Sequence, residues 1–200
     1  GSGPAWWAPT FDDTDWSSGS APIGYSLGTI STNLLSTLRD VSPSFHTRTT
    51  FNASAGEAAS TRPLRLNINY NDGFIAWING IEVARANMGA PKSHIFHDQV
   101  SYRSNGSTTA TQSFTLPVAS TLLNQGDNVI AIQINNDSIN GNMRLDMALE
   151  IDNASGTDPV LVNFASPLKY RPGLSEPTTD LSEPAALADG PSDWIELHNP

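Results

Sequence analysis

The chain has 200 residues, a formal net charge of −10 and no cysteine. Its 10 basic residues against 20 acidic ones exclude binding to nucleic acid through a basic face, and they argue against docking on anionic lipid. The absence of cysteine excludes disulfide frameworks, thiolate catalysis and cysteine-bound metals. No run of 18 apolar residues is present, so we predict no membrane insertion.

Alternating apolar and polar residues predict β-strands along most of the chain. Residues 64–70 alternate in this way, and Asn71-Asp72-Gly73 follows as a hairpin turn. Residues 74–78 form the return strand, Asn79-Gly80 is a second turn, and residues 81–84 continue beyond it. We therefore expect three short antiparallel strands in this part of the chain.

The second half of the chain repeats the pattern. The predicted elements are strands at 112–116, 129–135 and 143–151, and one helical turn within 118–123. Alternation of this kind is typical of antiparallel sheets with one wet face, and no longer stretch has helical periodicity. The predicted fold class is therefore all-β, an antiparallel β-sandwich or jelly roll.

Composition predicts the domain boundaries. We assign residues 1–5 to a tag or linker, 6–152 to the β-domain, 153–159 to a linker and 160–200 to a proline-rich tail. The tail has too little apolar sequence to fold alone, so it either packs on the first domain or begins a truncated second one. We predict that Trp194, Ile195 and Leu197 pack on the β-domain or pair with a neighbouring chain.

Several separated motifs carry a family resemblance. The blocks are Trp7-x3-Phe11-Asp12-Asp13-x2-Trp16, Asn71-Asp72-Gly73-x3-Trp77-Ile78-Asn79-Gly80 and Gly126-Asp127-Asn128-Val129-Ile130-Ala131. Together they resemble the galactose-binding-domain-like β-jelly roll, a carbohydrate-binding-module-like domain of secreted bacterial multidomain proteins. The resemblance implies two antiparallel sheets, and a secreted or cell-surface location. Some members bind sugars at end loops or on a concave face, others are spacers, and some carry a structural calcium.

The tail carries a second resemblance. Residues 192–199, Ser-Asp-Trp-Ile-Glu-Leu-His-Asn, resemble the opening of a lamin-tail-type domain. The acidic Asn-Glu pair usual upstream in that family is absent, because Val162-Asn163-Phe164 stands there. The resemblance implies the truncated start of such a domain and carries no function over.

Aromatic and amide side chains are the candidate carbohydrate-binding residues, because sugar rings stack on aromatic rings while amides and charged groups bond the hydroxyls. The candidates are Trp6, Tyr102, His46, Arg85, Asn87 and Trp77. We expect Trp6 to be exposed and Trp7 to be buried. The alternative is that Trp7, Trp16 and Trp77 only pack. In the same alternative, Arg85 and Asn87 bond backbone groups of their loop.

Carboxylates are the candidate metal ligands. Asp12, Asp13 and Asp15, with Glu150 from a neighbouring strand, could supply oxygens to a structural calcium. The alternative is an Asx-turn or helix cap at Asp12, and residues 135–138 are a second oxygen-rich loop. His94, His97 and Asp98 have a spacing that suits a solvated loop better than a transition-metal site.

Two further features have structural or catalytic interpretations. Arg48 and Asp146 are expected to form an ion pair that holds the fold. Gly24-Tyr25-Ser26-Leu27-Gly28 matches a hydrolase nucleophile elbow, which needs a strand, a sharp turn and a helix around Ser26.

These observations give three functional hypotheses. The first is a non-catalytic carbohydrate-binding module that targets an attached secreted enzyme or surface protein to polysaccharide or another glycan. Its partners would be that glycan and other domains of the same polypeptide. The second is a structural spacer or adhesion module without a small ligand, and the remote third is a serine hydrolase that uses Ser26.

Overall fold

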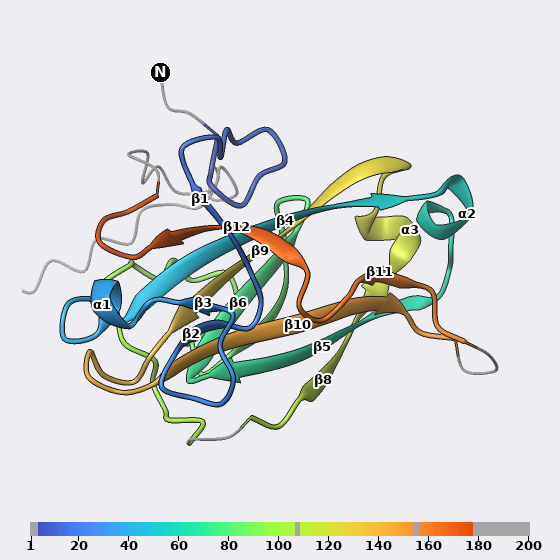
Figure 1. Ribbon diagram of the computed structural model, residues 1–200. Helices are drawn as coiled ribbons and strands as arrows, with labels where there is room; N and C mark the ends of the chain where they lie inside the picture. Colours follow the sequence, from blue (N-terminus) through green and yellow to red (C-terminus); the bar gives the residue numbers. More distant parts are fainter. Residues whose placement is uncertain (1–3, 107–108, 154–156, 178–200) are drawn as a thin grey trace, which may run out of the picture.

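The computed structural model describes residues 4–106, 109–153 and 157–177, and it is an all-β sandwich of two sheets (Figure 1). This confirms the predicted fold class. The elements in chain order are β1 (Ser17–Ser20), β2 (Ile23–Tyr25), β3 (Thr32–Asn33), α1 (Leu35–Leu38), β4 (Ser44–Ala53), α2 (Ala55–Ala58), β5 (Pro63–Asn71), β6 (Gly73–Ile78), β7 (Ile81–Ala86), β8 (Gln112–Val118), α3 (Ala119–Leu122), β9 (Gly126–Asn135), β10 (Met143–Ile151), β11 (Val160–Val162) and β12 (Pro167–Pro172).

The strands divide into two six-membered sets. Sheet A has the order β1-β12-β4-β9-β6-β7, and sheet B has the order β3-β2-β10-β5-β8, with β11 paired to β10. All pairs are antiparallel except β2 with β3. The six strands predicted from alternation all form, and the predicted helical turn is α3. The hairpin predicted at Asn71-Asp72-Gly73 is wrong, because β5 belongs to sheet B and β6 to sheet A, so the chain crosses between the sheets there. The hairpin predicted at Asn79-Gly80 does form, between β6 and β7.

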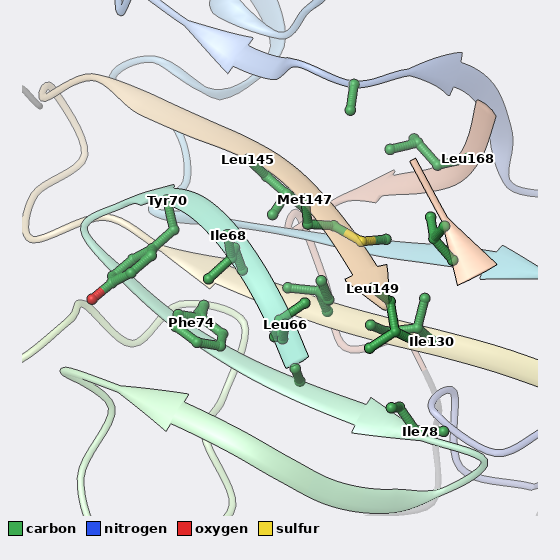
Figure 2. Close-up of a cluster of buried hydrophobic side chains, with 14 of the residues drawn as sticks. Leu66, Ile68, Tyr70, Phe74, Ile78, Ile130, Leu145, Met147, Leu149 and Leu168 are labelled. Carbon is green, nitrogen blue, oxygen red and sulfur yellow. The ribbon is translucent and has the colours of Figure 1, made fainter. Parts of the chain in front are cut away.

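The core lies between the two sheets, and Figure 2 shows its central part. Alternate residues of each strand point into it, as the period of two requires. Sheet B contributes Leu66, Ile68, Leu145, Met147 and Leu149, and sheet A contributes Phe74, Ile78, Ile130 and Leu168. The residues between them face outward, so their exposure depends on which segments cover the outer face of each sheet.

The sandwich extends beyond the boundary that we predicted at Asp152. β11 pairs with β10, and β12 lies inside sheet A between β1 and β4. Leu168 of β12 is 8% exposed and Val162 of β11 is 3% exposed, so both belong to the core. Residues 160–172 therefore pack on the first domain, which was one of the two alternatives for the tail.

The lamin-tail resemblance and the packing expected of Trp194, Ile195 and Leu197 lie outside the described residues. Each of the three helices has four residues. Within the described part of the chain, no helix has the length and apolarity needed to cross a membrane.

Candidate functional site

The outer face of sheet A carries a second apolar cluster, formed by Trp6, Trp16, Ile75, Trp77, Met88, Ile95 and Ala131. Trp6 lies at its centre and is 2% exposed, with ring centroids 5.2 Å from Trp77 and 4.8 Å from His46. The expectation that Trp6 is exposed is therefore wrong. Trp7 is instead the half-buried ring, stacked on Trp77 at 5.2 Å with a 13° interplanar angle.

A buried arginine fixes the N-terminal segment, residues 4–16, over this face (Figure 1). Arg48 of β4 is 3% exposed, and its Nε donates to the Asp13 carboxylate at 2.7 Å. The same guanidinium donates to the backbone carbonyls of Trp6, Ala8 and Phe11. The predicted partner of Arg48, Asp146, lies elsewhere: its carboxylate is 3.9 Å from Arg144 and accepts the N–H of Ala165.

His46 is a packing residue of the same outer face. Burial, together with the charges of Arg171 and His97, lowers the pKa of His46 to about 3. The imidazole is thus neutral at physiological pH and 1% exposed. Three of the predicted sugar-binding residues, Trp6, His46 and Trp77, therefore form a closed aromatic layer instead of an open platform.

A second candidate region lies in the loops at the end of the sandwich opposite α2 and α3 (Figure 1). We call this region the loop pole; it consists of residues 71–73, 87–106, 109–111 and 136–142. Asp72 N–H donates to Asn135 O at 3.2 Å, and Ser101 N–H donates to Asn136 O at 2.8 Å. Asn87 Nδ2 donates to Asp72 O at 2.9 Å. These bonds join three chain segments that are far apart in the sequence.

The carboxylate of Asp72 organises the loop pole. It is 2% exposed, and its Oδ1 accepts from Asn71 Nδ2 at 3.0 Å, Ser104 Oγ at 3.1 Å and Asn105 N–H at 2.7 Å. Its Oδ2 accepts the Asp137 N–H at 3.1 Å. Burial raises the pKa of Asp72, and the Asp137 charge adds to this, against the lowering effect of the hydrogen bonds. Sequence reasoning missed this role because Asn-Asp-Gly reads as an ordinary hairpin turn.

Tyr102 is an exposed aromatic side chain of the loop pole, at 62% exposure, and Phe96 is another, at 45%. Its N–H donates to Asn87 O at 2.9 Å, and its hydroxyl accepts from Gln99 Nε2 at 3.0 Å. Its ring packs on Gly89, where an added Cβ would lie 2.8 Å from Tyr102 Cε2. The structure therefore brings Tyr102 and Asn87 together, as two of the six predicted binding residues.

Arg85, in strand β7, stabilises the loop that follows this strand. Its guanidinium is bidentate on Glu82, with both N–O distances 2.9 Å. It also donates to the backbone carbonyls of Met88 and Ser93. This confirms the alternative that Arg85 bonds the backbone of the loop after the hairpin. Asn87 likewise bonds a backbone carbonyl, that of Asp72.

The carboxylates predicted to bind calcium are not brought together. Asp13 is engaged by Arg48 on sheet A, whereas Glu150 bonds Arg65 and Asn67 on sheet B. Asp12 accepts the N–H of Thr14 at 3.0 Å, which is the Asx-turn alternative, and hydrogen bonds to Thr14 lower its pKa. Across residues 4–106, 109–153 and 157–177, no group of three or more His, Asp or Glu side chains could hold a metal ion.

Two buried amide oxygens lie at or next to the loop pole. The Oδ1 atoms of Asn71 and Asn135 are fully buried and have no hydrogen-bond partner among the described residues. Both residues adjoin Asp72, one by sequence and one through the Asp72 N–H bond. Carboxylate and amide oxygens are the ligands that calcium prefers. The second oxygen-rich loop, residues 135–138, thus contributes one of these two amide oxygens, that of Asn135.

The remaining candidates have other surroundings. Ser26 is exposed after β2, and the next element along the chain is β3, so the strand-to-helix elbow of a hydrolase does not form there. His97 Nδ1 lies 2.7 Å from Glu176 Oε1, which also accepts the His97 N–H. His94 is exposed, with its ring 4.6 Å from that of Phe96.

No protein-family model and no curated protein sequence matches the chain. Among solved structures, it is similar to an α-L-rhamnosidase of Streptomyces avermitilis complexed with L-rhamnose, with 16% identity and a TM-score of 0.43. That match covers 90% of this chain and 14% of the rhamnosidase. A second match is the Pleurotus ostreatus lectin in its apo form, with 13% identity and a TM-score of 0.40, over 84% of this chain and 40% of the lectin. The chain thus spans less than half of either protein.

Proposed function

We propose that this chain is a non-catalytic glycan-binding module whose ligand docks on the loop pole. The observation that carries the proposal is Tyr102, an aromatic ring that is 62% exposed and yet fixed on both sides by Gly89 and Gln99. A flat, exposed ring offers its face to the apolar C–H surface of a sugar. Fixing the ring before binding reduces the entropy lost when the ligand docks.

Polar groups around Tyr102 supply the second element of glycan recognition. Arg103, Ser104 and Asp137 are exposed beside it, and they offer donors and acceptors that a sugar hydroxyl can use. The buried Asp72 holds Ser104, Asn105 and the Asp137 backbone in place. The pole thus combines one stacking surface with pre-positioned hydrogen-bonding groups, the composition that carbohydrate sites require.

A calcium ion at the loop pole belongs to the same proposal. Asp72, Asn71 and Asn135 would hold it through their carboxylate and amide oxygens. When bound, the ion supplies positive charge that compensates the buried carboxylate and stiffens the loops. The chain's own residues then present Tyr102 and the surrounding polar groups to the ligand.

The test is binding of the full chain to a panel of soluble glycans and insoluble polysaccharides, with and without calcium. Tyr102→Ala should weaken a positive interaction about two- to tenfold, since one stacking contact contributes about 0.5–1.5 kcal/mol. Phe164→Ala is the matched control, because Phe164 is an exposed aromatic residue on the connection between β11 and β12. Silence across the panel by a folded sample contradicts the proposal.

One observation favours the second candidate, a structural spacer or adhesion module. Residues 4–16 cover the outer face of sheet A with Trp6 and its neighbours, so that face offers no open aromatic platform. In either case we propose a secreted or cell-surface setting, where the module connects or targets other domains of the same polypeptide. Binding that depends on Tyr102 separates the two candidates.

A further inference from the structure

A hollow of about 320 Å³ lies between the N-terminal segment and strand β12, and its lining includes no residue of the loop pole. Its walls include Phe11, Asp12, Asp15, Trp16, Tyr170 and Arg171. The volume lies within the range of small-ligand sites in proteins. The second hollow of similar size, near α2, has no aromatic residue among those that line it.

The three aspartates of the N-terminal segment have different surroundings. Asp13 turns inward to Arg48, whose guanidinium also holds three backbone carbonyls of the segment. Asp12 and Asp15 are exposed and line the hollow. Among the described residues, neither of these two carboxylates has a cationic side chain within 4.0 Å. The buried Arg48 thus fixes a loop that presents two carboxylates without an ion-pair partner among the described residues, while the Lys169 ammonium donates to the adjoining Trp16 carbonyl at 3.3 Å.

The remaining walls add apolar and donor groups. The Phe11 and Trp16 rings meet edge to face with centroids 5.7 Å apart. Trp16 is buried, whereas Phe11 is half-buried and holds the Arg48 guanidinium over its ring at 5.3 Å. On the facing strand, Arg171 Nη2 bonds Ser175 Oγ at 2.7 Å, and the same guanidinium has further N–H donors. The hollow therefore combines two acceptors of a cation, an aromatic wall and one guanidinium.

We infer that this hollow is a second ligand site, which takes a sugar with a free ammonium group, such as a glucosamine unit. The ammonium is attracted by Asp12 and Asp15, and the apolar ring face lies against Phe11 and Trp16. Arg171 donates to a hydroxyl or ring oxygen at the opposite side. A neutral N-acetylated sugar loses the charge attraction, so the site discriminates between the two by charge.

The test is calorimetric titration of the full chain with short β-1,4-linked glucosamine oligomers and with their N-acetylated counterparts. The glucosamine oligomer should bind, and its affinity should fall as salt is added. The N-acetylated oligomer and the Asp15→Asn variant should each bind at least about tenfold more weakly, because each loses a hydrogen bond between charged groups. Asp12→Asn should weaken binding in the same direction.

Asp127→Asn is the matched control. Asp127 is an exposed aspartate at the start of β9, opposite Asn52 at the far end of β4, so its substitution changes net charge equally. Loss of affinity in Asp127→Asn as large as in Asp15→Asn would mean non-specific attraction to an acidic protein and would overturn the inference. Equal affinity for both oligomers, or no binding by a sample folded by circular dichroism, would overturn it too.

The Tyr102→Ala variant separates this inference from the proposed function. Glucosamine binding should be unchanged in that variant, because Tyr102 belongs to the loop pole. If Tyr102→Ala abolishes it, the ligand sits at the pole and the second site is rejected. If neutral glycans bind through Tyr102 while glucosamine oligomers do not bind, the proposed function stands and only this inference fails.

Discussion

The Arg48 guanidinium and the Asp13 carboxylate form an ion pair of 2.7 Å that joins the outer face of sheet A to the N-terminal segment. The arginine is almost fully buried, whereas the aspartate keeps a side-chain exposure of 25%. Three backbone carbonyls of the segment accept further bonds from the same guanidinium. This single side chain therefore connects the sandwich to the aromatic layer that covers it.

Arg48→Met should detach the segment. The substitution keeps the side-chain volume but leaves Asp13 and three carbonyls without their donor, which should lower the free energy of unfolding by about 3–5 kcal/mol. Denaturant unfolding followed by tryptophan fluorescence measures this, since Trp6 and Trp16 become solvated. Arg39→Met, at an exposed arginine, is the control and should change stability by less than about 0.5 kcal/mol.

A chain that stops after Asp152 should lose cooperative folding. It lacks β11 and β12, so β4 and β1 each lose a strand partner and the core loses Val162 and Leu168. Thermal unfolding by circular dichroism should give a broad transition or none, compared with the full chain. A shortened chain that melts cooperatively at the temperature of the full chain would show that β12 is dispensable.

His46 should make folding stability sensitive to acid. Burial lowers its pKa to about 3 in the folded protein, whereas an unfolded imidazole titrates near 6.5. The unfolded state therefore takes up the proton first, so this contribution is complete above about pH 6.5 and is lost as the pH falls towards 3. Between pH 7.5 and pH 5, the wild-type chain should lose about 2 kcal/mol more than His46→Gln. Parallel pH profiles of the two would contradict this.

Calcium should stabilise the wild-type chain through Asp72. An ion that binds only the folded state at a hundred times its Kd adds about 2.7 kcal/mol, which raises Tm. Asp72→Asn should abolish the rise, since the amide removes the charge of the buried carboxylate. Asp12→Asn should retain it, although the sequence favours the Asp12 loop. If chelator-treated wild type shows no rise, calcium drops out of the proposed function.

Gly89→Ala should disturb the glycan-binding surface specifically. Gly89 has φ of +75°, and an added Cβ would lie 2.8 Å from the Tyr102 ring, so the substitution strains the backbone and displaces Tyr102. We expect a stability loss of about 1 kcal/mol and weaker binding of any glycan that uses Tyr102. Gly56→Ala is the opposite case: it lies in α2 with open space around it, so stability should rise by about 0.5–1 kcal/mol.

Alternation of apolar and polar residues was enough to predict the sandwich. A strand that is buried on one face must place every second residue inward. The strands at 129–135 and 143–151 could therefore be predicted from the sequence alone. The hairpin turn at Asn79-Gly80, between β6 and β7, was equally local, because Asn and Gly favour the positive φ angles of such a turn. The hairpin expected at Asn71–Gly73 was not, since β5 and β6 enter different sheets. The helical turn at α3 followed from the same local information.

Such patterns could not predict which side chains are buried on the outer faces of the sheets. Trp6 and Trp7 are adjacent and chemically identical, and only the return of the segment across sheet A decides that Trp6 is buried and Trp7 is half-exposed. The prediction of Asp146 as the partner of Arg48 was wrong for the same reason, because Asp13 approaches from a segment that has no strand pairing of its own. Contacts between distant segments depend on the path of the whole chain.

Local sequence patterns were enough to predict the class of fold, the strands and the Asn79-Gly80 turn, because these depend on neighbours a few positions apart. Only the tertiary structure decided that β12 enters sheet A and that Asp72, Asn135 and Ser101 meet at one pole. It also decided that Asp12 and Asp15 line a hollow while Asp13 is engaged by Arg48. The physical reason is that strand order and side-chain pairing arise from non-local packing, which minimises exposed apolar surface and buried unpaired charge over the whole molecule.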